Sequence, residues 1–127
     1  MAKLSIRIDL APEAHLGPGK ARLLELIGET GSISAAGRAL DMSYRRAWLL
    51  VDSLNATFKE PVVSTMLGGK AGGGARLTPF GREVIQNYRK VEARAAAAGK
   101  AYLAALEGGL AKPMTAKKVR KDPDAAE

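Results

Sequence analysis

"GSISAAGRALDMSYRRAWLLVDSLN", residues 31 to 55, has the pattern of two helices joined by a short turn. Ser32 and Ser43 belong to the residue types that cap a helix N-terminus, and the Asp-Met pair before the second serine suits a tight turn. The pattern therefore predicts a short helix that follows Ser32 and ends at Leu40, and a second helix over residues 44 to about 57.

Apolar residues line one side of both helices, at Ile33, Leu40, Met42, Ala47, Leu50, Val51 and Leu54. The first helix also carries two small residues, Ala36 and Gly37, as a helix-turn-helix needs where its helices cross closely. A plain helical hairpin with solvated arginines fits this segment equally well. The segment alone does not decide between the two.

The outward side of the second helix begins with Ser43, Tyr44, Arg45 and Arg46. In a helix-turn-helix this end enters the DNA major groove, where an arginine can donate paired hydrogen bonds to guanine O6 and N7. These four residues are therefore candidate DNA contacts. Trp48 is expected to support the scaffold instead of touching DNA.

A glycine-rich loop follows and favours the DNA-binding interpretation. Residues 62 to 67 and 76 to 78 suit two strands, and the glycines between them suit a hairpin loop. A phosphate-binding P-loop would have Ser or Thr after its lysine and then a helix, whereas Lys70 is followed by Ala71 and more glycines. A sequence with the spacing of regular secondary structure, RLTPFGREVIQNY, follows the glycines directly, which argues against a flexible linker. The loop is predicted to be a wing, with Lys70 and Arg76 as candidate contacts to DNA.

The fragments SISAAGRALDMSYRRAW, GGKAGGGARLTPFG and REVIQNY resemble the N-terminal DNA-binding domain of ModE-type molybdate-responsive bacterial regulators, whose winged helix is similar to that of LysR-type regulators. The resemblance covers roughly residues 20 to 107. It implies that residues 43 to 46 face DNA, that Lys70 lies at the wing tip, and that the regulated genes serve molybdenum transport or use.

The chain departs from this family in two places. Thr65 and Met66 stand where the family often has an arginine before the wing glycines. ModE proteins usually continue into molybdate-binding domains, whereas few residues follow Gly109. We therefore expect no molybdate sensor in this chain and no effect of molybdate on its DNA affinity.

The composition indicates a basic globular protein. A length of 127 residues with 46% hydrophobic residues suits one compact domain with tails, and a net charge of +7 favours an acidic partner such as nucleic acid or an anionic membrane. Neither a transmembrane stretch nor a signal peptide is readable, so a cytoplasmic protein is expected. The absence of cysteine, the single histidine and the lack of a catalytic motif predict no enzyme, no cofactor, no metal and no bound small molecule.

Two further elements are predicted before the helix pair. Residues 4 to 10, LSIRIDL, alternate as a half-buried strand does. A helix is predicted from Pro18 to Glu29 with Gly31 as its stop. His15, in the breaker cluster between them, is expected to be a solvated loop residue.

A long helix is predicted after the wing, from Pro79 to about Glu107 with Thr78 as its cap. Apolar and small residues step along it with heptad spacing, at Val84, Tyr88, Val91, Ala95, Ala98 and Tyr102. This spacing predicts a seam between two such helices, and hence a homodimer.

The predicted fold is mainly α with a small β wing: a winged helix-turn-helix over residues 1–78, a long dimerisation helix over 79–107 and a disordered tail over 108–127. The predicted function is sequence-specific binding of double-stranded DNA as a transcriptional regulator. Two alternatives stay open at this stage. One is an architectural protein that binds DNA with little sequence preference, and the other is a winged-helix module that binds other proteins.

Overall fold

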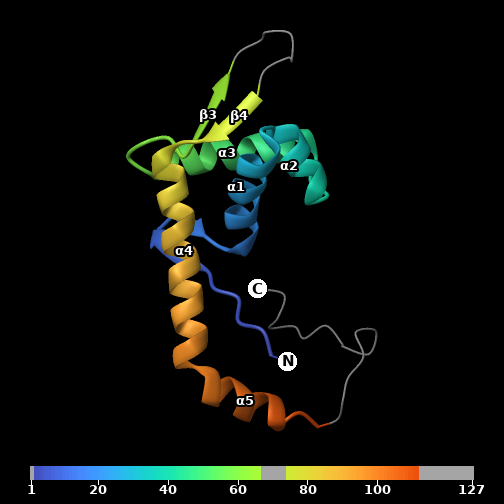
Figure 1. The fold of residues 1–127 in the computed structure, drawn as a ribbon, viewed down its shortest axis with the longest axis vertical. Coiled ribbons are helices and arrows are strands. Elements are labelled where there is room, and N and C mark those ends of the chain that lie inside the picture. Colours follow the sequence, from blue (N-terminus) through green and yellow to red (C-terminus); the bar gives the residue numbers. More distant parts are fainter. Residues whose placement is uncertain (1, 67–73, 112–127) are drawn as a thin grey trace.

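The computed structural model describes residues 2–66 and 74–111, which are mainly helical with two small antiparallel sheets (Figure 1). In chain order the elements are β1 (Ile8–Ala11), β2 (Ala14–Leu16), α1 (Pro18–Thr30), α2 (Ile33–Ala39), α3 (Tyr44–Thr57), β3 (Val63–Met66), β4 (Gly74–Leu77), α4 (Pro79–Ala98) and α5 (Lys100–Gly108). The β3–β4 hairpin and α5 lie at opposite ends of α4.

The capping serines and the terminating glycine that the sequence indicates lie at ends of the first three helices. Gly31 ends α1 in the left-handed region at φ 72°, a conformation that glycine adopts without steric cost. The Oγ atom of Ser32 accepts a hydrogen bond from the Ala35 N–H at 3.0 Å, and that of Ser43 accepts one from the Arg46 N–H at 3.1 Å. The predicted caps and helix boundaries are confirmed.

The core lies where α1 crosses α2 and meets β4 and α4. Leu23, Leu24 and Ile27 of α1 are fully buried at its centre. A Cβ atom on Gly37 of α2 would lie 2.9 Å from the Cβ of Ala47 in α3, which is closer than carbon atoms pack. Gly37, one of the two small residues predicted at this helix crossing, is therefore required by it, and the other, Ala36, is fully buried.

The β3–β4 hairpin is anchored to the helices by hydrogen bonds at its base. The Asn55 side chain of α3 accepts hydrogen bonds from the Val62 and Val63 N–H groups at 2.8 and 3.1 Å and donates one to the Val63 carbonyl at 3.1 Å. The Ala75 N–H donates to the Gly31 carbonyl at 3.0 Å. The hairpin is thus fixed against the end of α1 as well as α3.

The N-terminal prediction was partly wrong. The strand starts only at Ile8, and it pairs with β2, which the sequence did not indicate. His15 lies in β2 opposite Asp9 and is partly buried, so it is not the solvated loop residue that was expected. The preceding residues are extended beside α4, where the Tyr88 hydroxyl donates a hydrogen bond of 2.6 Å to the Ile6 carbonyl.

The single long helix was also predicted wrongly. α4 ends at Ala98, Gly99 intervenes, and α5 turns away from the axis of α4 (Figure 1). Glycine costs a helix interior about 1 kcal/mol relative to alanine, so it is a natural position for such a break.

The predicted seam does not lie on one free face of this helix. Val84 and Tyr88 are buried in the core of the same chain, whereas Val91 is 46% exposed and Tyr102 of α5 is 74% exposed. Ala95 is partly buried and Ala98 is exposed.

Candidate nucleic-acid interface

The N-terminal half of α3 presents an exposed stripe opposite the core. Ala47, Val51 and Leu54 are buried on one side of the helix. Since successive helical residues are about 100° apart, Arg45 lies on the side opposite these three. Leu49 lies on the same side as Arg45, one helical turn further along the chain. Within the described residues, the Arg45 guanidinium makes no ion pair. Arg45 is therefore free to meet a ligand that approaches the helix from outside.

Tyr44 and Trp48 form one flank of this stripe. Tyr44 is 61% exposed, and its ring stands edge-on to Trp48 with ring centroids 6.2 Å apart. These two residues line a shallow hollow of about 420 Å³ together with Arg45 and Leu49. Trp48 is partly buried and packs against the tyrosine ring, and its scaffold role stays a prediction.

Arg46 lies on the other flank, about 100° around the helix axis from Arg45. It lines a separate pocket with Arg7, His15 and Lys20, three residues from the N-terminal segment and α1. Sequence reasoning missed these three residues because they lie more than twenty positions before α3. Their only sequence signal is their basic character: Arg7 stands in the predicted strand, and His15 and Lys20 stand near the start of the predicted helix at Pro18.

The remaining candidates are more dispersed. The Ser43 hydroxyl caps α3 and therefore already accepts a hydrogen bond. Arg76 is exposed on β4, opposite Ser64 in the hairpin register. Lys70 lies outside the described residues. The structure thus brings residues 43 to 46 together at one end of α3 and places Arg76 on the hairpin.

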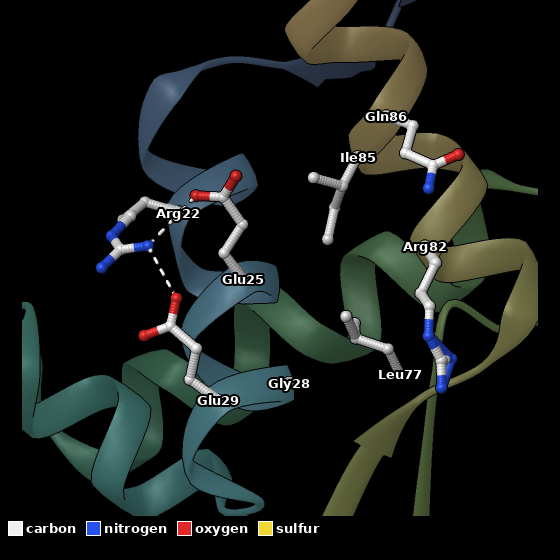
Figure 2. A pocket seen from close by; sticks show the side chains of 8 residues that line it. All are labelled: Arg22, Glu25, Gly28, Glu29, Leu77, Arg82, Ile85 and Gln86. Atoms are coloured by element: carbon white, nitrogen blue, oxygen red, sulfur yellow. Dashed lines mark hydrogen bonds and ion pairs between the residues drawn. The ribbon is translucent and has the colours of Figure 1, made fainter.

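A hollow of about 450 Å³ between α1 and α4 has a different charge pattern (Figure 2). The Arg22 guanidinium lies between the carboxylates of Glu25 and Glu29, at 3.2 Å from each. Arg89 of α4 forms two further hydrogen bonds of 2.9 Å to Glu25, and these contacts lower the pKa of that carboxyl. The acidic and basic groups of this hollow neutralise one another, so it does not favour a polyanion.

Neither a membrane-spanning segment nor a metal centre is found among residues 2–66 and 74–111. Their helices lack the length and apolarity that crossing a bilayer requires. Nor do histidines and carboxylates in these ranges gather into a group that could hold a metal ion.

No protein-family model matches the chain. Among curated proteins it is 49% identical over 80 residues to the molybdenum-pterin-binding protein MopB of Rhodobacter capsulatus. These 80 residues are 63% of this chain and 30% of that protein. It is 37% identical over 92 residues to the molybdenum transport protein ModE of Azotobacter vinelandii, 72% of this chain and 33% of the relative. It is 33% identical over 87 residues to the DNA-binding transcriptional dual regulator ModE of Escherichia coli K12, and the matched stretch is 68% of this chain and 33% of the relative. The chain thus spans about a third of the length of these homologues.

Proposed function

We propose that this chain is a sequence-specific DNA-binding transcriptional regulator of the ModE type, in which α1 to α3 and the β3–β4 hairpin form a winged helix-turn-helix. The observation that carries the proposal is the exposed N-terminal end of α3, where Arg45 lies opposite the buried face of the helix. The net charge of +7 supports a polyanionic partner. The name of the Azotobacter vinelandii relative, a molybdenum transport protein, supports genes of molybdenum transport or use as its targets.

The shape of α3 suits the major groove of DNA. That groove is about 12 Å wide and admits one α-helix, so residues at the outer side of the helix meet base edges. Arg45 occupies this outer position and has no competing carboxylate among the described residues. An arginine so placed can recognise guanine, which gives α3 the means to select a sequence.

Binding measurements on two duplexes test this function against its rivals. The genomic sites of the protein are first mapped, and the affinity for one site is compared with that for a random duplex of equal length at several salt concentrations. We expect the mapped site to bind about 10³-fold tighter or more. Equal affinities would favour the architectural protein, and the absence of any salt-sensitive DNA binding would favour the protein-interaction module.

We further propose that the protein acts as a homodimer held together partly through α5. Large apolar side chains are exposed on and after this helix: Tyr102 is 74%, Leu106 72% and Leu110 60% exposed. A second copy of the chain would bury them, and a dimer would present two α3 helices to two half-sites about one turn of DNA apart.

A charged variant of α5 tests the dimer. Replacing Tyr102 and Leu106 together by glutamate places charges on the exposed apolar side of α5, so we expect sedimentation to show a mass of one chain where the wild type shows two. Ala104→Glu is the matched control, because Ala104 is exposed on the other side of the helix. A double variant that sediments like the wild-type dimer would rule out this surface as the interface.

A further inference from the structure

A pocket of about 390 Å³ lies on the flank of α3 that carries Arg46. Its basic lining residues come from four separate parts of the chain: Arg7 from the segment before β1, His15 from β2, Lys20 from α1 and Arg46 from α3. Met42 and Leu50 supply apolar wall. The pocket therefore joins the N-terminal hairpin to the beginning of α3, and no carboxylate is among its lining residues.

Two of these basic groups are held in position by the hairpin. The Lys20 ammonium donates a hydrogen bond of 3.1 Å to the His15 carbonyl, which keeps this partly buried side chain at the pocket. The Arg7 guanidinium pairs with Asp9 at 3.0 Å, but both side chains are mostly exposed, so water screens that pair. The Arg46 guanidinium has no ion pair within the described residues.

The positive charges of the pocket exceed the nearby negative charge. The pKa of His15 is lowered, first by the Lys20 ammonium, then by burial and by Arg7, while Asp9 opposes these effects. The pKa of Lys20 is lowered by burial and by Arg7. Part of each shift comes from repulsion between like charges, of His15 by Lys20 and Arg7 and of Lys20 by Arg7, and the rest comes from burial. A bound anion would relieve this repulsion.

We propose that this pocket receives a phosphate group of the DNA backbone beside the groove that α3 enters. The inference rests on the proposed function and extends it to the N-terminal hairpin. Arg45 and Arg46 are adjacent in sequence but about 100° apart around the helix axis. When Arg45 points toward base edges, Arg46 points toward the groove wall, which consists of phosphates.

The proposal separates the roles of the two arginines. Arg45 remains a base-reading residue, whereas Arg46 joins Arg7 and Lys20 as a backbone contact. Phosphate contacts carry no sequence information but fix the orientation of a protein on the duplex. A contact built from α1 and the hairpin as well as from α3 would hold the recognition helix at a defined angle in the groove.

Salt dependence of DNA binding is the first test, with the double variant Arg7→Gln and Lys20→Gln. Because each neutralised phosphate contributes about 0.9 to the slope of log affinity against log salt, we expect the slope to weaken by about that amount per bound subunit. The mapped site and the random duplex should lose affinity by the same factor. Lys90→Gln with Arg94→Gln is the matched control, since it removes two exposed charges from α4 outside this pocket.

The single histidine of the chain gives a second test on the unaltered protein. NMR of the His15 ring follows its titration with and without DNA. A phosphate among Lys20, Arg7 and Arg46 stabilises the imidazolium, so the pKa of His15 should rise on DNA binding. In the free protein Asp9 is the carboxylate of the described residues that raises this pKa, and the phosphate would add to its effect. Because this measurement uses the unaltered protein, it remains valid even if the double variant fails to fold.

The possible outcomes separate this inference from the proposed function. If the wild type binds DNA, an unchanged salt slope in the folded double variant or an unchanged His15 pKa overturns the phosphate pocket and leaves the function standing. If the wild type shows no salt-sensitive DNA binding, the proposed function itself is wrong. Inorganic phosphate is the third probe: a rise in the His15 pKa with phosphate but none with DNA would show a site for a free anion instead.

Discussion

Arg45→Ala is expected to weaken binding to the mapped DNA site by about 1–3 kcal/mol, roughly 5- to 150-fold, and to weaken binding to a random duplex much less. The reason is the position of the side chain, which is exposed opposite the buried side of α3 and makes no ion pair within the described residues. Removing it deletes hydrogen bonds to a base edge without disturbing the core. Fluorescence anisotropy titrations on the two duplexes measure the difference.

Two other arginines serve as comparisons for this variant. Arg46→Ala should lower the affinity for both duplexes by a similar factor, because a phosphate contact does not depend on sequence. Arg94→Ala removes an exposed charge from α4 and should leave the affinities for the mapped site and for the random duplex nearly unchanged. If Arg45→Ala weakens both duplexes equally, Arg45 contacts the backbone and base reading lies elsewhere.

Gly81→Ala is expected to destabilise the fold by about 3 kcal/mol or more. Gly81 lies in the first turn of α4, and a Cβ atom there would overlap the carbonyl oxygen of Val62. That carbonyl cannot move away freely. It accepts a hydrogen bond of 3.0 Å from the Thr78 N–H, and the Val62 N–H donates one of 2.8 Å to Asn55. Relieving the overlap would break the contacts that tie the hairpin to α3 and α4.

Thermal unfolding measures this effect directly. A loss of about 1 kcal/mol lowers the midpoint by roughly 2–8 °C in domains of this size, so the Gly81→Ala variant should melt well over 6 °C below the wild type. Gly108→Ala is the matched control, because a Cβ atom at that end of α5 meets nothing within 4 Å. Similar melting of the two variants would mean that α4 can shift away from Val62 at little cost.

The sequence by itself determined the features that depend on neighbouring residues. A cap acts within three residues, as Ser43 does with the N–H of Arg46, and Gly31 ends α1 through its own backbone conformation. The boundaries of α1 to α3 and the existence of the β3–β4 hairpin could therefore be predicted. The basic character of the start of α3 could be predicted for the same reason.

Only the tertiary structure decided which surface each residue meets. Heptad spacing is the same whether a helix packs on its own domain or on a second chain, so the sequence could not show that Val84 and Tyr88 are buried within one chain. Arg45 and Arg46 look equivalent in sequence, yet helix geometry places them on different sides of α3. The pocket that Arg46 shares with Arg7 and Lys20 exists because the unpredicted β1–β2 hairpin folds back beside α1. Contacts between residues so far apart in the chain are set by packing, which no local pattern records.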